Sequence, residues 1–125
     1  MIHIFYRHTS NASGLGKNRP HWFSFEKSLN SILSSIEGLD YVKFYLMYDG
    51  ECNINDPRIH HIENFKGGSD WASYVYTWNY IKNLNLEDDA IIYIAENDYA
   101  FVKGWPSKVI ELFSTYGDKI GRAHV

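Results

Sequence analysis

Residues 90–105 have the sequence AIIYIAENDYAFVKGW, in which an apolar run leads directly into polar and acidic residues. Residues 90–95 are small or favour β-strands, and three polar residues, Glu96, Asn97 and Asp98, follow at the point where a strand of this length should end. In an open α/β sheet, ligands bind in the crevice outside the carboxyl ends of the strands. The acidic side chains therefore lie where a metal ion or a phosphate group would bind.

Length and composition indicate one globular domain. The chain has 125 residues, of which 45% are hydrophobic and 17% aromatic, enough for a packed core. A net charge of -3 gives no basic surface for nucleic acid. The single cysteine, Cys52, excludes an intramolecular disulfide framework. No apolar run approaches the roughly 18 residues that cross a bilayer, so we expect a cytoplasmic protein.

The chain around residues 90–105 alternates between strand and helix patterns. Apolar runs predict strands at residues 2–6, 42–48 and 59–62, and helical spacing or capping signals predict helices at residues 22–36, 71–83 and 106–113, the last closing near Gly117. Residues 7–20 are predicted to form a loop. Such apolar strands, alternating with helices, predict an α/β domain with three layers, α/β/α, around a mostly parallel sheet.

Two more predicted strand ends carry polar or small residues. Asp49 ends the second strand next to Gly50, a pair that is also typical of a plain turn. Residues 67–70, Gly-Gly-Ser-Asp, precede the second helix, which Ser69 or Asp70 can cap. The glycines would let a ligand approach the positive end of the helix, although a simple capped loop explains the same sequence.

In their order and spacing, these features resemble the nucleotide-binding half of GT-A glycosyltransferases, the fold of glycosyltransferase family 2 and its relatives. The resemblance covers residues 2–117 and depends on these segments: Tyr48-Asp49-Gly50, Gly67-Gly68-Ser69, Glu96-Asn97-Asp98-Tyr99 and Gly104-Trp105. It implies a Rossmann-like domain that binds a nucleotide-diphosphate sugar.

The acidic triplet resembles the D-x-D element of that family. The resemblance implies that Asp98 binds Mn²⁺ or Mg²⁺, that Glu96 holds the metal or the ribose, and that Asn97 lies beside the nucleotide. A divalent cation held by carboxylate oxygens would neutralise charge on the departing diphosphate. The Glu and Asn in the first two places depart from the family pattern and lower the charge at the metal.

The resemblance also assigns other nucleotide-binding positions. Asp49 would hydrogen-bond the base. Three consecutive residues after the first strand would wrap the base and ribose: Arg7, His8 and Thr9. Three residues near the start of the second helix would lie beside the nucleotide or its phosphates: Lys66, Gly68 and Ser69. Four aromatic residues have spacings that fit helix faces or a helix entry, so we expect packing residues and not sugar platforms: Trp71, Tyr74, Trp78 and Trp105.

By the same resemblance, residues 1–119 form the donor-binding part of a longer glycosyltransferase. The acceptor site and the catalytic base would follow in the rest of that protein, so the fragment alone should be inactive. Residues 120–125, IGRAHV, are predicted to be a non-native tail, with a short polar native tail as the alternative. The expected setting is glycan or surface-polysaccharide assembly, in the cytoplasm or peripheral to the membrane.

Two other functions fit the same general layout. A sugar-1-phosphate nucleotidyltransferase should have its complete Gly-rich activating loop directly after the first strand, and residues 14–17, Gly-Leu-Gly-Lys, match it only in part. They also lack the spacing of a Walker phosphate loop. A non-catalytic nucleotide-binding α/β module would need no metal ion.

Overall fold

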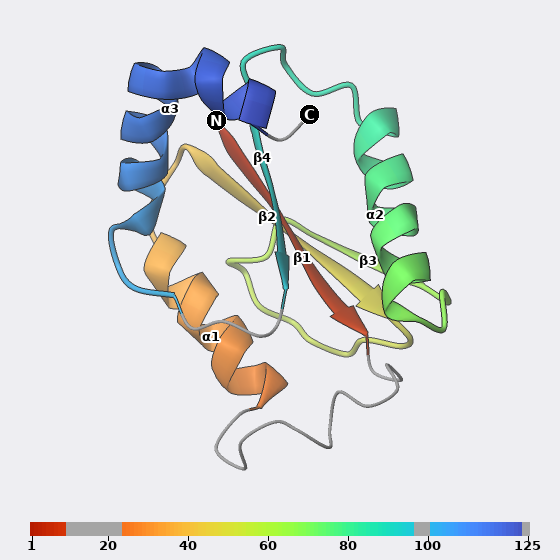
Figure 1. The fold of residues 1–125 in the computed structure, drawn as a ribbon. Coiled ribbons are helices and arrows are strands. Elements are labelled where there is room, and N and C mark those ends of the chain that lie inside the picture. Colours follow the sequence, from red (N-terminus) through yellow and green to blue (C-terminus); the bar gives the residue numbers. More distant parts are fainter. Residues whose placement is uncertain (10–23, 97–100, 124–125) are drawn as a thin grey trace.

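Four parallel strands form one sheet with the order β3-β2-β1-β4 (Figure 1). The computed structural model describes residues 1–9, 24–96 and 101–123, without the side chains of residues 9 and 116–123. Its strands are β1 (Ile2–Thr9), β2 (Val42–Asp49), β3 (His61–Phe65) and β4 (Ile91–Glu96). Its helices are α1 (Phe25–Ile36), α2 (Asp70–Asn83) and α3 (Trp105–Ala123).

The chain changes direction across the sheet after β3. From β1 it continues to β2 and β3 on one side, and α2 then carries it back to β4 on the other side of β1. Strand β1 thus pairs with β2 and with β4, both in parallel. The strand order reverses between β1 and β4, and this topological switch point is where open α/β sheets bind ligands, at the carboxyl ends of the strands.

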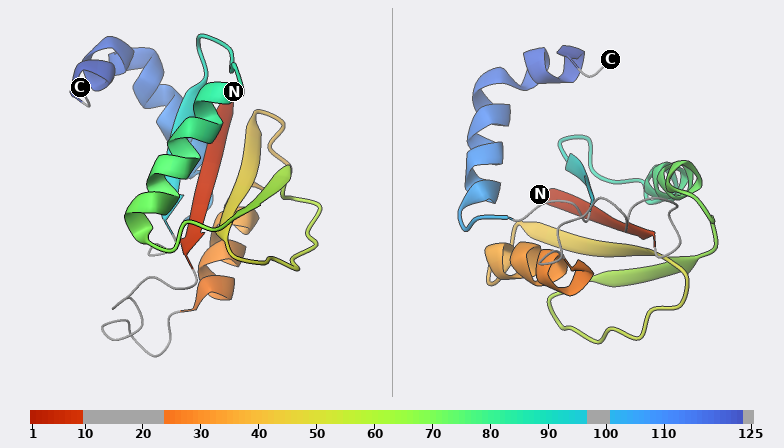
Figure 2. Two further views of the ribbon diagram at one scale, coloured as in Figure 1. Left: turned by 90° about the vertical axis from the view of Figure 1, so that its right-hand side faces the viewer. Right: turned by 60° about the horizontal axis from the view of Figure 1, so that its bottom comes forward.

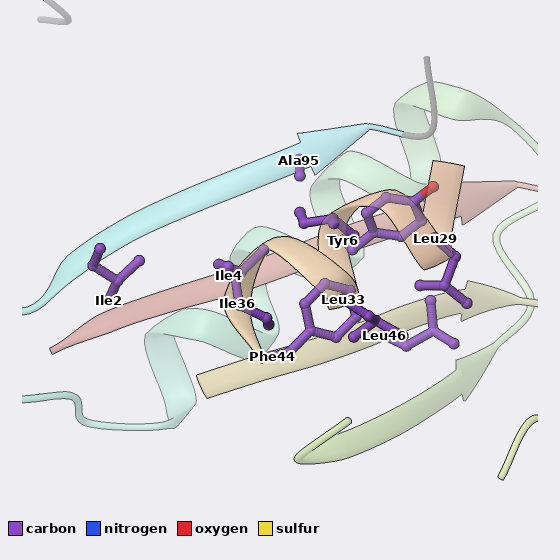
Figure 3. Packing of buried hydrophobic residues seen from close by; sticks show 10 residues of the cluster. Ile2, Ile4, Tyr6, Leu29, Leu33, Ile36, Phe44, Leu46 and Ala95 are labelled. Carbon is purple, nitrogen blue, oxygen red and sulfur yellow. The ribbon is translucent and has the colours of Figure 1, made fainter. Parts of the chain in front are cut away.

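Helix α1 packs its apolar stripe on one face of the sheet (Figure 3). The residues buried in this layer come from α1 and three strands: Ile2, Ile4, Tyr6, Leu29, Ile32, Leu33, Ile36, Phe44, Leu46 and Ala95. The Tyr6 hydroxyl donates to Ser28 Oγ at 2.7 Å, which satisfies a buried polar group beneath the helix. The start of α3 joins the same layer, where Trp105 Nε1 donates to Ser35 Oγ at 2.7 Å.

Helix α2 covers the opposite face, so the sheet lies between α1 and α2 (Figure 2). The buried residues of this second layer are Phe5, Tyr45, Met47, Phe65 and Ile81. The rings of Phe5 and Tyr45 stack with centroids 4.5 Å apart. The prediction of an α/β domain with three layers and a parallel sheet is therefore confirmed, and all four described strands are parallel.

Several predicted boundaries are wrong. Residues 7–9 belong to β1 and not to a loop, because they pair with Met47–Asp49 despite their polar side chains. The third strand begins at His61 and ends at Phe65, since it follows the register of β2. Helix α3 continues past Gly117 to Ala123, because a helix tolerates an internal glycine at a cost of only about 1 kcal/mol.

The expected packing of the aromatic residues is only partly right. Trp105 packs against the α1 layer, as predicted. Trp71, Tyr74 and Trp78 are instead exposed on α2, because this helix turns Ser73, Thr77 and Ile81 toward the sheet. None of the helices in the described parts of the chain is long and apolar enough to cross a membrane.

Candidate ligand site at the carboxyl edge of the sheet

Two predicted site residues, Asp49 and Glu96, lie at the same carboxyl edge of the sheet. Asp49 ends β2 and Glu96 ends β4, with β1 between them. Asp49 is the register partner of Thr9, and Glu96 that of Arg7. Parallel strands bring their carboxyl ends to one edge, which is why residues far apart in the chain meet here. Asn97 and Asp98, the other two members of the acidic triplet, lie outside the described residues.

Arg7 connects three elements at this edge. Its Nη2 donates to Glu96 Oε1 at 2.7 Å, and its Nη1 donates to Asp70 Oδ1 at 3.2 Å and to the Asp70 carbonyl oxygen at 3.0 Å. Its guanidinium also lies 5.4 Å from the ring centroid of Tyr74. The side chain is only 4% exposed, and a buried cation needs such charged partners. Arg7 therefore fixes the ends of β1 and β4 against the start of α2.

Arg7 and His8 occupy opposite faces of β1. Arg7 lies on the α2 side, whereas the His8 ring packs on the α1 side, with its centroid 3.9 Å from that of Phe25 and 4.9 Å from that of Tyr48. Consecutive strand residues alternate in this way. A base on one side of β1 would thus contact only one of these two side chains directly. Thr9 ends the strand, and its side chain lies outside the described residues.

The Asp49 carboxylate holds the loop that leads into α2. Its Oδ1 accepts a hydrogen bond from the Gly67 amide at 3.0 Å, and its Oδ2 accepts one from the Gly68 amide at 2.9 Å. A Cβ on Gly67 would lie 3.2 Å from Asp49 Oδ2 and 3.3 Å from Ala72, so a side chain there would require its neighbours to shift by a few tenths of an ångström. Gly68 has φ +82°, which favours glycine. Asp49 is 6% exposed and anchors this loop.

The start of α2 is capped as the sequence predicts. Ser69 is the N-cap, and its Oγ accepts a hydrogen bond from the Ala72 amide at 3.1 Å. Asp70 is the first helical residue, where a negative charge stabilises the positive end of the helix dipole. Lys66 is exposed directly after β3, at the same edge of the sheet.

Two carboxylates at this edge each have one oxygen available for a ligand. Arg7 engages Asp70 Oδ1 and Glu96 Oε1. Within the described ranges, Asp70 Oδ2 and Glu96 Oε2 have no hydrogen-bond partner, and the two side chains are 69% and 45% exposed. The edge therefore presents carboxylate oxygens beside a buried cation.

Glu96 could supply one ligand of a divalent-cation site. A carboxylate oxygen such as Glu96 Oε2 is the ligand type that Mn²⁺ and Mg²⁺ prefer. No group of three or more His, Cys, Asp or Glu side chains able to hold a metal occurs in the described part of the chain. A complete set of ligands at this edge would need residues such as Asp98 in addition to Glu96.

The Arg7–Asp70–Glu96 cluster has only a weak signal in the sequence. The sequence predicts Asp70 as a possible helix cap, and the resemblance places Arg7 in a loop around the base. Both pairings are long-range, with separations of 63 and 89 residues. The available signal is an arginine next to an apolar strand, because a buried arginine requires acidic partners.

Comparison with known proteins finds no matching family model, no matching curated protein and no matching solved structure. The part of the resemblance that is established is the Rossmann-like α/β domain, with a parallel four-stranded sheet in the order β3-β2-β1-β4 and helices on both faces.

Proposed function

We propose that this chain is the donor-binding part of a glycosyltransferase. It binds a nucleotide-diphosphate sugar together with a divalent cation, and the sugar is transferred to a hydroxyl group of a glycan or another acceptor. The observation that carries the proposal is the position of Glu96 at the carboxyl end of β4, next to β1 at the switch point. The acidic triplet begins there and continues with Asn97 and Asp98.

In this proposal, Glu96 and Asp98 hold Mn²⁺ or Mg²⁺, which supplies positive charge to the diphosphate when bound. Arg7 keeps the Glu96 carboxylate in place through its 2.7 Å hydrogen bond. Asp49 acts through the Gly67 and Gly68 amides, and so fixes the loop and the helix start that border the same edge. Lys66 provides a mobile positive charge for phosphate.

The test is a titration of nucleotides into the 125-residue chain, with and without Mn²⁺. The probes are UDP, GDP and their glucose and mannose conjugates, and calorimetry measures their dissociation constants. We expect binding that depends on Mn²⁺ and that weakens at least tenfold in Asp98→Ala, because a hard cation loses a carboxylate ligand. Asp88→Ala is the matched control, since this exposed aspartate precedes β4 at the opposite edge of the sheet.

Two results would contradict the proposal. Nucleotide binding that needs no metal and is unchanged in Asp98→Ala would support a non-catalytic nucleotide-binding module. Equal losses in Asp98→Ala and Asp88→Ala would show a general charge effect and no site at the end of β4.

A further inference from the structure

Four apolar residues follow one another along one exposed side of α2. Trp71, Tyr74, Val75 and Trp78 are all exposed and have the i, i+3, i+4, i+7 spacing of a continuous helical stripe. Such a stripe normally faces a core, whereas the side chains of this one are 39–72% exposed. Its first residue follows Asp70, which contacts Arg7 at the candidate site. Figure 1 shows the first turn of α2 beside the carboxyl ends of β1 and β2.

The first two rings of the stripe lie nearly parallel beside the candidate site. The centroids of Trp71 and Tyr74 are 6.0 Å apart, and their planes differ by 20°. The buried Arg7 guanidinium lies 5.4 Å from the Tyr74 centroid and so holds that ring in position. Trp71 is 72% exposed, so its indole presents a large apolar surface that the fold does not use for packing.

Two carboxylates contact the same guanidinium that lies over the Tyr74 ring. Asp70 precedes Trp71 in the chain, and Glu96 shares the Arg7 guanidinium with Asp70. In the structurally described segments, Asp70 Oδ2 and Glu96 Oε2 have no hydrogen-bond partner. Both oxygens can accept hydrogen bonds from hydroxyl groups. The cluster therefore combines flat apolar rings with hydroxyl acceptors.

A sugar ring has matching chemistry, because one face of a pyranose presents C–H groups and its edge presents hydroxyl groups. We infer that Trp71, Tyr74, Asp70 and Glu96 form a subsite for a pyranose ring, with the Trp71 indole under its apolar face, the stacked Tyr74 ring supporting that indole, and the carboxylates at its hydroxyls. This inference rests on the proposed function for the assignment of the sugar to the donor or the acceptor. The pyranose chemistry itself follows from the side chains.

The C-terminal part of the stripe lacks this combination of aromatic rings and carboxylates. Trp78 lies seven residues after Trp71, about 10 Å along the helix. The Lys82 ammonium group lies 5.8 Å from the centroid of its ring, in place of the guanidinium that Tyr74 has. Trp78 therefore provides a matched control, as a second exposed tryptophan on the same face of the same helix.

The experiment is saturation-transfer NMR on the 125-residue chain and its Trp71→Ala and Trp78→Ala variants. The probes are the methyl glycosides of glucose, galactose and mannose, and UDP-glucose and GDP-mannose with Mn²⁺. We expect transfer to sugar-ring protons in the unmodified chain and in Trp78→Ala. In Trp71→Ala we expect the apparent affinity for the sugar ring to fall about tenfold. The midpoint of thermal unfolding should stay unchanged, because Trp71 is exposed.

The two kinds of probe distinguish the source of the sugar. Transfer to the methyl glycosides that is lost in Trp71→Ala assigns the subsite to an acceptor sugar. Transfer only to the ring of a nucleotide sugar, again lost in Trp71→Ala, assigns it to the donor. If the glycosides bind through Trp71 while no nucleotide binds, the subsite stands and the proposed function fails. If nucleotide binding requires Mn²⁺ and Asp98 while Trp71→Ala changes no ring signal, the proposed function stands and the subsite fails.

Two further results overturn the subsite. The first is the absence of transfer to any sugar ring in the unmodified chain. The second is an equal loss in Trp71→Ala and Trp78→Ala, which would mean that the stripe as a whole is a contact surface, as expected for a protein partner.

Discussion

Helices α1 and α2 cover opposite faces of one sheet but bury different amounts of apolar side chain. Helix α1 buries four large aliphatic residues and two serines: Leu29, Ile32, Leu33, Ile36, Ser28 and Ser35. Helix α2 buries two small polar residues and one isoleucine: Ser73, Thr77 and Ile81. Trp71 and Trp78 of α2 are exposed, whereas Tyr76 stacks on Phe65 of β3 and Tyr80 packs against the buried layer. On the α2 face, the sheet itself supplies the large rings, including Phe5 and Tyr45.

The difference lies in which contacts join each helix to the sheet. Burial of apolar surface dominates at α1, and this force has no direction. At α2, the burial of Ile81 is joined by directional polar contacts to the strands: the bonds from Arg7 to Asp70, and the 2.6 Å hydrogen bond from the Tyr76 hydroxyl to Glu63 Oε2 on β3. The helix beside the candidate site is thus oriented by hydrogen bonds as well as by packing.

The sharpest way to test this contrast is to truncate one large side chain on each helix. Leu33 is 1% exposed, so Leu33→Ala should lower the free energy of unfolding by about 2–5 kcal/mol through lost transfer energy and a cavity. Trp78→Ala on α2 removes a larger side chain, yet it should change stability by no more than about 0.5 kcal/mol. Urea denaturation measures both. Similar losses in the two variants would contradict the contrast.

A second test removes the anchor of the α2 loop. Asp49→Ala leaves the Gly67 and Gly68 amides without their carboxylate, which should lower the free energy of unfolding by about 2–3 kcal/mol. The two amides should also exchange hydrogen faster. Asp49→Asn keeps one acceptor and should lose less.

A different result would show that Asp49 contacts the ligand directly. If Asp49→Ala keeps its stability and its slow amide exchange but no longer binds nucleotide, the residue is a ligand contact and not an anchor.

The smallest expected effect concerns the two caps, where the helices should behave alike. Ser24 Oγ accepts from the Lys27 amide and Ser69 Oγ from the Ala72 amide, both at 3.1 Å. Ser24→Ala and Ser69→Ala should each lower the free energy of unfolding by about 1 kcal/mol. Calorimetric or urea unfolding of both variants checks this. A much larger loss in Ser69→Ala would mean that α2 depends on its cap far more than α1 does.

The fold could be predicted because its main strands and α1 carry strong local patterns. Strands β2 and β4 are apolar runs, and the apolar spacing of α1 specifies its buried face. The errors fall where polar residues occupy regular structure. Residues 7–9 are polar, so the local pattern predicts a loop there, and β3 is a short edge strand with exposed polar positions. A local sequence pattern does not show which strands pair, and strand pairing sets the end of β1 and the bounds of β3.

The prediction that Trp71, Tyr74 and Trp78 are packing residues was wrong for a related reason. Apolar spacing predicts that one side of a helix is buried, but it does not say which layer covers it. The sheet beneath α2 is already filled by its own aromatic rings, so Ser73 and Thr77 face it. Because parallel strands end at the same edge of a sheet, the sequence correctly predicts that Asp49 and Glu96 lie at one edge. It could not show that Arg7 joins Glu96 to Asp70, since that contact depends on the assembled sheet.

The central position of β1 has a consequence for how the chain folds. Ile2 pairs with Val42 on one side and with Ile91 on the other, so the second pairing closes a loop of nearly ninety residues. Contacts between such distant residues slow folding, because the entropy of loop closure is lost before the contacts form. During synthesis, one edge of β1 stays unpaired until β4 has been made. The carboxyl ends of these two strands, where the candidate site lies, are therefore among the last parts of the sheet to form.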